Sequence, residues 1–311
     1  MWTAEQFGRV AVLMGGWSAE REVSLVSGDA VLRGLQAAGI DAHGVDVGRD
    51  IDQRLRAGGF ARAFNVVHGT GGEDGVLQGV LELLQLPYTG SGVTASAVSM
   101  DKLLTKRIWR SAGLPTPNFI RLSAESDWDA VVKTLGLPVV VKPAAEGSSI
   151  GVTIVTRRED LAAAYANAAA GGGVAMAEQF IDGDELTCGI LDGKALPLIR
   201  VVATQQFYDF HAKYVAEDTE YRCPAGLDDV DEQAIRQLCA QAFQVLGASG
   251  WGRVDCFRDR AGKVWLIELN TVPGMTSHSL VPKAAAVAGI DFNDLVLRIL
   301  ATSLNRNGRT V

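Results

Sequence analysis

The stretch VWLIELNTVPGMT, from Val264 to Thr276, begins as a buried β-strand and ends as a polar turn. Its first residues are apolar or β-branched, yet Glu268 and Asn270 lie inside the run, just before a Pro-Gly pair. Because side chains alternate between the two faces of a strand, we expect both polar side chains to share a face with Leu266. That face changes from apolar to polar along its length, which is typical of a strand that runs from the core into a functional site.

The preceding strand, GWGRVDCF, is predicted to pair with this stretch as a hairpin. A two-residue turn at 261–262 would pair Arg260 with Lys263. Counted back in that register, Asp255 lies directly opposite Glu268 on one face of the hairpin. The two strands are therefore expected to present two facing carboxylates.

Two facing carboxylates and the amide of Asn270 would form a cluster of oxygen ligands. Carboxylates at close range repel each other unless a cation lies between them. Such a set suits Mg²⁺, which completes its shell with waters and nucleotide phosphates. The alternative is an edge hairpin with solvated acids, which the apolar strands around them disfavour. Arg253 and Phe257 are expected on the same face as Asp255.

The composition is that of an ordinary globular protein and argues against two classes of partner. The 311-residue chain has a formal net charge of −7, whereas nucleic-acid-binding surfaces are usually basic. No apolar stretch is long enough to span a membrane, and the N-terminus lacks the features of a signal peptide. Four cysteines without a CxxC pair are expected to be reduced core residues. We therefore expect a cytoplasmic protein without nucleic-acid or membrane partners.

Three segments of different character are expected along the chain. Residues 1–98 alternate strand and helix, which predicts a parallel α/β domain. Residues 99–184 are predicted to form a small α+β domain, in which VAMAEQFIDGDELTCGIL supplies two strands about a Gly-Asp turn. Residues 185–311 are predicted to form a third domain that ends in the helix FNDLVLRILATSL. The predicted fold class is therefore α/β with α+β parts.

Local signals give finer expectations in the first two segments. The strand Arg9–Gly16 is followed by a helix with Ser18 as its N-cap and Gly39 just past its end. In the loop KPAAEGSSIG, glycines such as Gly147 let the backbone approach a phosphate, and Lys142 precedes them. A plain hairpin turn is an equally good interpretation of that loop.

Seven motifs occur in one order along the chain: GGWSAEREVSL, HGTGGEDGVLQG, GSGVTASAVSMDK, KPAAEGSSIGV, FYDFHAKY, WGRVDCF and IELNTVPGMTSHSLVP. Together they resemble the signatures of the D-alanine–D-alanine ligase family, which has the ATP-grasp fold. The resemblance implies an N-terminal α/β domain, a central nucleotide-clamping domain and a C-terminal ATP-grasp domain. It also implies a homodimer.

The resemblance implies a reaction as well. ATP phosphorylates the carboxylate of one D-alanine, the amine of a second D-alanine attacks the acyl phosphate, and phosphate leaves. The product, D-alanyl-D-alanine, is used in peptidoglycan precursors. The implied cofactors are ATP and two Mg²⁺ ions, which Mn²⁺ can replace.

By motif match, the resemblance also implies a metal and nucleotide site. The metal ligands would be Asp255, Glu268 and Asn270. The ATP contacts would be Lys102, Lys142, Glu146, Gly147, Ser148, Ser149, Glu178, Phe180, Ile181, Glu185 and Lys213. The three lysines would contact phosphates. Glu178 and the backbone of the two residues at 180–181 would meet the adenine, and Glu185 would meet the ribose.

The substrate contacts follow in the same way. Glu20 would bind the ammonium of the first D-alanine, and Ser279 and Leu280 would receive the carboxylate of the second. Arg253 and the backbone N–H of Gly274 would form an oxyanion hole. Fixed donors of this kind are what a tetrahedral intermediate requires.

Residues 205–226 form a long segment of mixed charge without a clear period, for which a lid over ATP is predicted. On that lid, Tyr214 would bond to Ser148 and Glu20 and so favour D-alanine over D-lactate as the second substrate. The alternative is that the Tyr214 ring only packs.

Some residues depart from the family pattern. Trp17 stands where a small hydroxyl residue is usual, Ala144 and Ala145 replace Ser-Arg, and His211 replaces an acid. His68 has two interpretations, a place in the first-substrate site or a structural hydrogen bond.

Two other functions remain open from the sequence. One is an ATP-grasp carboxylate–amine ligase for a different amino acid, which the amino acid that stimulates ADP release would distinguish. The other is a nucleotide- or amino-acid-binding module that has lost catalysis. The presence of Arg253, Asp255, Glu268 and Asn270 argues against it, because such a module usually lacks one of these residues.

Overall fold

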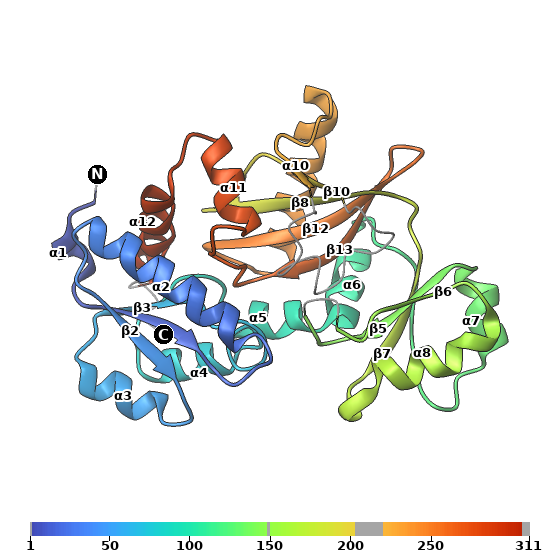
Figure 1. Cartoon of the computed structure of the whole chain (residues 1–311), viewed down its shortest axis with the longest axis horizontal. Coiled ribbons are helices and arrows are strands. Elements are labelled where there is room, and N and C mark those ends of the chain that lie inside the picture. Colours follow the sequence, from blue (N-terminus) through green and yellow to red (C-terminus); the bar gives the residue numbers. More distant parts are fainter. Residues whose placement is uncertain (1, 148–149, 203–219, 307–311) are drawn as a thin grey trace.

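The computed structural model describes residues 2–147, 150–202 and 220–306, and three β-sheets follow one another along this part of the chain (Figure 1). The first sheet lies among the N-terminal helices, blue in Figure 1. The second forms the green lobe at the opposite end, and the third, yellow to orange, lies between them. No helix in the described ranges is long and apolar enough to cross a membrane.

The first sheet is parallel, as predicted, with strand order β2-β1-β3. Its strands are β1 (Val10–Gly15), β2 (Ala42–Val47) and β3 (Arg62–Asn65). The helices of this part are α1 (Ala4–Phe7), α2 (Arg21–Ala37), α3 (Ile51–Gly58), α4 (Val76–Leu83) and α5 (Val93–Met100). The central strand β1 is apolar almost throughout, because both of its edges are paired and its side chains are buried.

Helix α2 packs closely on β1 because a glycine faces the strand. A Cβ added at Gly28 would lie 2.4 Å from the Cβ of Met14, so no larger residue fits without a shift of the helix. The close packing fixes the height of the helix N-terminus above the sheet. That terminus follows the loop between β1 and α2, which carries Glu20.

The predicted end of α2 is confirmed and its predicted start is wrong. Gly39 has a φ of +79°, the left-handed conformation expected just after a helix. The N-cap position belongs to Glu20, not to Ser18. The Ser18 hydroxyl instead donates to the carbonyl of His68 (2.7 Å) and accepts from the N–H of Glu20 (3.2 Å). Ser18 therefore joins two loops rather than capping the helix.

The second sheet is antiparallel, with strand order β4-β7-β5-β6. Its strands are β4 (Phe119–Arg121), β5 (Val139–Pro143), β6 (Thr153–Val155) and β7 (Ala175–Gln179). Its helical segments are α7 (Trp128–Leu135), η1 (Arg158–Asp160), α8 (Leu161–Ala168) and η2 (Ala170–Gly172). Strand β4, which follows Pro115 and Pro117, lies at the edge of the sheet, where a segment with prolines is tolerated because proline has no N–H to donate to a ladder. Strands β5 and β6 flank the glycine loop.

The third sheet is antiparallel and has the order β11-β10-β8-β12-β13, with β9 paired to β8. Its strands are β8 (Gly183–Leu191), β9 (Lys194–Ala195), β10 (Ile199–Val202), β11 (Glu220–Arg222), β12 (Trp251–Asp259) and β13 (Val264–Asn270). The helices that accompany it are α6 (Lys102–Ser111), α10 (Asp229–Val245), α11 (Leu280–Val287), α12 (Phe292–Thr302) and η3 (Ser303–Arg306). Strand β11 lies inside the segment predicted as a lid, so the last part of that segment belongs to the sheet.

Strands β7 and β8 form as predicted but do not share a sheet. Strand β7 pairs with β4 and β5, whereas β8 pairs with β10 and β12. The connecting residues 180–182 therefore cross from the second sheet to the third. The expectation of two strands about one turn within the central segment is wrong, because partners distant in sequence determine the pairing of each strand.

The first and third sheets share a hydrophobic core. One cluster of buried residues includes Val12 of β1, Leu35 of α2, Trp251 of β12 and Ile299 of α12. The second sheet has a core of its own, around Val141 and Leu161 among others. The first and third sheets are therefore joined by apolar packing.

The β12–β13 hairpin places Asp255 opposite Glu268, as predicted, but through a different register at the turn. The N–H of Asp259 donates to the carbonyl of Lys263, so the loop has three residues rather than two, and Arg260 does not pair with Lys263. A β-bulge between Asp255 and Cys256 then shifts the pairing by one residue. The two differences cancel, and the facing pair is the one expected.

The bulge also corrects the expected faces of β13. Cys256 pairs with Leu266 and Asp255 with Glu268, so Ile267 is the extra residue. Leu266 therefore lies on the same face as Leu269, and both are buried in one core cluster. Glu268 and Asn270 occupy the opposite face, and do not share it with Leu266 as strict alternation predicted.

Gly28 and Gly79 offer a matched test of the α2 packing. Nothing lies within 4 Å of a Cβ added at Gly79 in α4. We expect Gly28→Ala to lower the free energy of unfolding by about 1–3 kcal/mol through overpacking against Met14. Gly79→Ala should raise it by up to about 1 kcal/mol, since alanine is the better helix former. Thermal unfolding of both variants checks this, and equal midpoints would contradict the proposed contact.

Candidate active site

The polar face of the β12–β13 hairpin is organised around the carboxylate of Asp255. Arg253 donates to both of its oxygens, from Nε at 2.8 Å and from Nη2 at 2.7 Å. The hydroxyl of Thr187 on β8 donates to Oδ1 (2.5 Å), and Nδ2 of Asn270 donates to Oδ2 (3.0 Å). Donors from three neighbouring strands thus surround the carboxylate of Asp255 and fix its orientation.

The second carboxylate of this face, Glu268, lies beside a lysine. Nζ of Lys102 is 3.3 Å from Oε2 of Glu268 and donates to the carbonyl of Glu146 (2.7 Å). Lys102 is the first residue of α6, whose N-cap Asp101 accepts from two backbone N–H groups of the first turn. Lys102 therefore joins the third sheet to the start of the glycine loop.

A cavity between the sheets collects several of the predicted residues. Its lining includes Glu73, Lys102, Glu146, Gly147, Glu268 and Asn270. Five of these six come from the predicted ATP and metal sets. The start of the glycine loop, Lys102 and the polar end of β13 therefore line the same cavity.

Glu178, Lys142 and Lys106 form a buried ionic cluster. Lys142 and Lys106 contact different oxygens of the Glu178 carboxylate, Lys106 at 2.9 Å. Burial would raise the pKa of Glu178, but the charges of the two lysines outweigh it and hold that pKa below its ordinary value. Burial lowers the pKa of Lys106 to about 8. The predicted adenine and phosphate residues thus lie in contact, with a second lysine that the sequence analysis did not select.

Glu20 lies where the first and second sheets come together. A Cβ at Gly69 would lie 2.8 Å from Oε2 of Glu20, and one at Gly147 would lie 3.2 Å from it. The glycines therefore leave room for the carboxylate between two loops. Glu20 is the residue expected to bind the first ammonium group.

Glu73 and His68 hold the loop after β13. Glu73 accepts from the N–H groups of Gly69 (2.7 Å) and Val272 (3.1 Å). Burial raises the pKa of Glu73 to about 8, and the charge of Glu20 acts in the same direction. Nδ1 of His68 lies 2.8 Å from the carbonyl of Val272, which can only accept, so this nitrogen carries the proton.

The other nitrogen of His68, Nε2, lies 3.1 Å from the hydroxyl of Ser27. With the proton on Nδ1, Nε2 accepts from this hydroxyl, which in turn accepts from the N–H of Met275. Burial lowers the pKa of His68, which agrees with a neutral ring. These contacts favour the structural interpretation of His68, since both ring nitrogens are occupied by protein groups.

Ser279 takes the N-cap position of α11, and Leu280 is the first residue of that helix. The Ser279 hydroxyl accepts from the N–H of Thr276 (2.9 Å), and a Cβ at Gly274 would lie 2.7 Å from it. The N-terminus of a helix favours a negative charge. The turn 273–279 therefore combines the predicted oxyanion donor with a place suited to a carboxylate.

The remaining predicted contacts are more scattered. Phe180 and Ile181 lie in the crossing between the second and third sheets, and Glu185 lies on β8 opposite Phe257 and Val201. Ser148, Ser149, His211, Lys213 and Tyr214 lie outside the described residues, as does most of the predicted lid.

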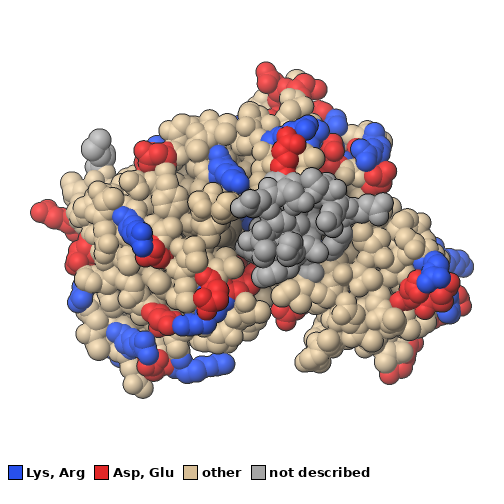
Figure 2. All heavy atoms as spheres, viewed as in Figure 1, with Lys and Arg blue, Asp and Glu red and all other residues tan. Residues whose placement is uncertain are grey.

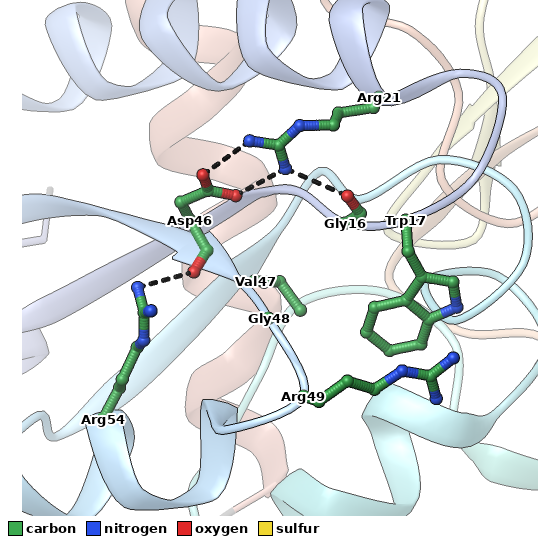
Figure 3. A pocket seen from close by; sticks show the side chains of 8 residues that line it. All are labelled: Gly16, Trp17, Arg21, Asp46, Val47, Gly48, Arg49 and Arg54. Carbon is green, nitrogen blue, oxygen red and sulfur yellow. Dashed lines mark hydrogen bonds and ion pairs between the residues drawn. The ribbon is translucent and has the colours of Figure 1, made fainter.

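A larger cavity, of about 250 Å³, lies away from these groups at the carboxyl ends of β1 and β2 (Figure 3). Arg21 crosses it and binds both oxygens of Asp46. The guanidinium carbon of Arg49 lies 4.2 Å from the centre of a Trp17 ring. Trp17 also packs on Gly71, where a Cβ would lie 2.4 Å from the indole. The departure at Trp17 therefore places an aromatic ring, in the loop that leads to Glu20, against the loop that follows β3.

In the described ranges, no three His, Cys, Asp or Glu side chains lie close enough together to hold a metal. The predicted set has only two such residues, and Asn270 supplies the third oxygen. Two carboxylates and an amide on one strand face are hard ligands of the kind that Mg²⁺ accepts together with phosphates and waters. In this structure each carboxylate is paired with a cation of the protein. Arg253 pairs with Asp255, and Lys102 pairs with Glu268. The residues present therefore fit the implied metal.

Three further residues of the site were not selected from the sequence. Lys106 follows Lys102 by four residues on α6, so it falls on the buried stripe of the helix where an apolar residue is usual. A lysine at such a position is the signal by which Lys106 could have been found from the sequence. Glu73 lies in a quoted motif without a role, and Thr187 gives no local signal because its contact depends on strand pairing.

Charged side chains of the described surface are mixed in sign. On the face in Figure 2, Lys and Arg lie close to Asp and Glu rather than in one broad patch. Ion pairs such as Arg158–Asp129 and Arg260–Asp182 are part of this pattern.

Comparison with known proteins identifies the family. The family model "D-ala D-ala ligase N-terminus" matches residues 45–91, and "D-ala D-ala ligase C-terminus" matches residues 108–301. A D-alanine–D-alanine ligase of Methylococcus capsulatus is 57% identical over 300 residues, which cover 96% of this chain and 97% of the relative. That of Ectopseudomonas mendocina is 54% identical over 302 residues, with 97% and 96% covered.

Solved structures agree. A D-alanine–D-alanine ligase from Bacillus anthracis, in complex with ATP, superimposes with a TM-score of 0.85 at 32% identity and covers 96% of this chain and 99% of its own. The ligase from Coxiella burnetii gives a TM-score of 0.83 at 26% identity, with 97% and 95% covered. The predicted ATP-grasp fold is thereby confirmed. With its seven motifs in order and close relatives along nearly its whole length, this chain belongs to the D-alanine–D-alanine ligase family.

Proposed function

We propose that this protein joins two D-alanines into D-alanyl-D-alanine at the expense of ATP, through an acyl phosphate, for peptidoglycan precursors. The observation that carries the proposal is the continuity of the site. Glu268 and Asn270, Lys102 and the start of the glycine loop border one cavity, Asp255 pairs with Glu268 across the hairpin, and the turn with Gly274 and Ser279 follows the same strand. The D-alanine–D-alanine ligases that are 57% and 54% identical to this chain over nearly its full length support the same substrates for it.

The nucleotide end of the site provides positive charge and glycine backbone. In phosphoryl transfer, a protein contributes mainly by positioning and by neutralising charge. We assign Lys102 and Lys142 to the phosphates and Asp255, Glu268 and Asn270 to Mg²⁺. When bound, Mg²⁺ would neutralise the phosphate charge that these carboxylates face.

The acyl-transfer end requires fixed donors where negative charge develops. Arg253 suits this role because its two bonds to Asp255 hold the guanidinium plane in one orientation. The backbone N–H of Gly274 is assigned as the second donor. Glu20 is assigned to the first ammonium, and the α11 N-terminus at Ser279 and Leu280 to the second carboxylate.

Several finer assignments belong to the same proposal. The three sheets correspond to three domains, near residues 1–98, 99–184 and 185–311, and the part of residues 205–226 that precedes β11 forms the lid. Lys213, Ser148 and Ser149 complete the phosphate contacts. Glu178, Phe180, Ile181 and Glu185 meet the nucleoside. We further propose a homodimer that acts in the cytoplasm, where ATP is supplied.

D-Alanine-dependent release of phosphate from ATP tests the proposed function directly. Strong stimulation by D-alanine, and weak stimulation by other amino acids, is the expected result. Stimulation by a different amino acid would favour the alternative ligase. Nucleotide binding without turnover would favour the non-catalytic module.

Removal of either metal carboxylate should abolish turnover while the fold persists. We expect this of Asp255→Ala and of Glu268→Ala, because one carboxylate fewer leaves the ATP charge poorly neutralised. Asp182→Ala, which removes an exposed ion pair with Arg260, is the control and should keep its rate. Phosphate release at saturating Mg²⁺ is the measurement, and near-normal turnover of either site variant would refute the metal assignment.

Arg253→Ala should reduce kcat by about a hundred-fold or more, the cost of one oxyanion-hole donor. ATP binding should be largely kept, since Arg253 is assigned to the transition state. Arg258→Ala is a matched control on the same strand, because Arg258 pairs with Asp231 instead. An unchanged kcat with a raised KM for ATP would assign Arg253 to phosphate binding.

Tyr214 is proposed to select the second substrate. Its phenol would bond to Ser148 and Glu20 and hold the lid where an ammonium is preferred to a hydroxyl. We expect Tyr214→Phe to shift the product towards D-alanyl-D-lactate when D-alanine and D-lactate are offered equally at pH 7. Product analysis decides the point, and an unchanged product ratio would leave Tyr214 with a packing role only.

A further inference from the structure

The buried cluster of Lys106, Lys142 and Glu178 contains two ammonium groups and one carboxylate. Lys142 and Glu178 belong to β5 and β7 of the second sheet, whereas Lys106 belongs to α6, which packs against the third sheet. The side chain of Lys106 is fully buried, and those of Lys142 and Glu178 are 7% and 5% exposed. A buried charge is costly unless an opposite charge faces it. The cluster therefore has one positive charge more than the protein balances within it.

Lys106 is held by acceptors from three directions. Its Nζ lies 2.9 Å from Oε2 of Glu178, donates to the hydroxyl of Thr116 (2.9 Å) and reaches the carbonyl of Leu266 (3.4 Å). Two of these contacts are hydrogen bonds and the third is an ion pair. Lys106 is therefore fixed in place by protein groups and fully buried.

Lys142 differs from Lys106 in its surroundings. It is the last but one residue of β5, directly before the glycine loop, and it contacts the oxygen of Glu178 that Lys106 does not. A nucleotide phosphate at the loop would attract Lys142 away from Glu178. Glu178 would then be a buried carboxylate with Lys106 as its remaining cation.

We propose that Lys106 is a positioning residue that serves as the permanent counter-ion of Glu178, so that Lys142 can exchange between Glu178 and a nucleotide phosphate. The inference rests on the proposed ATP-binding function. Without Lys106, the departure of Lys142 would leave Glu178 uncompensated. Glu178 would then either retain Lys142, at the expense of the phosphate, or take up a proton.

The consequence is a proton balance that can be measured. In the wild type at pH 7, Glu178 stays ionised when nucleotide binds, and Lys106, with a pKa of about 8, is already mostly protonated. Nucleotide binding to the wild type should therefore be coupled to little proton uptake at this cluster. In Lys106→Met, binding should be coupled to uptake of up to one proton by Glu178, and affinity should improve as the pH falls from 8 to 6.

The experiment is calorimetric titration of the full chain with Mg²⁺ and a non-hydrolysable ATP analogue, in buffers of different ionisation enthalpy. We expect Lys106→Met to bind the analogue about ten-fold or more weakly at pH 7 and to take up close to one proton more than the wild type. Thr116→Val removes a hydrogen-bond partner of Lys106 but no charge. It should keep the proton balance of the wild type even where it lowers stability.

A double-mutant cycle separates the counter-ion role from packing. In a Glu178→Gln background no carboxylate remains to be balanced, so adding Lys106→Met should cause no further proton uptake and little further loss of affinity. If Lys106→Met does not fold, Lys106→Gln, which keeps donors for Thr116 and Leu266, takes its place. Proton uptake equal to that of the wild type, or an additional uptake that persists without Glu178, would overturn the proposal. A wild type that fails to bind the analogue at all would refute the proposed function instead.

Discussion

The carboxylate of Asp255 is the interaction on which the site depends, because it accepts hydrogen bonds from residues of three adjacent strands. Thr187 on β8, Arg253 on β12 and Asn270 on β13 all donate to it. Charge-assisted hydrogen bonds are stronger than neutral ones, at about 1.5–3 kcal/mol each. The same group that would bind a metal therefore also orients the arginine and the amide beside it. The polar face of β13 is ordered by this charge, which explains why a strand from the core ends in acids rather than in apolar residues.

The path of the β12–β13 hairpin shows what the sequence could and could not predict. Alternation and a short glycine turn were enough to place Asp255 opposite Glu268. The three-residue loop and the bulge at Ile267 were not visible, because each changes the register by one residue and the two changes cancel. The face of Leu266 was wrong for the same reason. Likewise, Ser18 has the residue type of an N-cap, but its hydroxyl is taken by His68 from another loop. The alternation of residues therefore predicted which side chains face each other. The path of the backbone between them depends on contacts with residues distant in sequence.

The ionic residues that the sequence analysis did not select have a common property, since their partners are distant in the chain. Lys106 contacts the carbonyl of Leu266 on the third sheet and the carboxylate of Glu178 on the second, both far from it in sequence. Glu73 reaches Val272 across nearly two hundred residues. A single sequence shows such groups only as exceptions, such as a lysine on the apolar stripe of a helix. The resemblance to a family indicated the residues expected to act on the substrates. It did not indicate Lys106 and Glu73, the charged residues that hold their neighbours in place.

The three sheets are joined in two different ways, and the difference bears on how the site responds to charge. The first and third share a continuous apolar core, so the distance between Glu20 and the β13 turn is set by close packing. The second sheet meets α6 through a small cluster of buried residues, Leu103, Ala144 and Met176, and through the polar contacts of Lys102 and Lys106. Apolar packing is indifferent to a bound phosphate, whereas ammonium groups are not. The glycine loop is therefore carried by a sheet that is attached partly through ion pairs, so a nucleotide bound as proposed would alter the charges that hold the loop near Glu268.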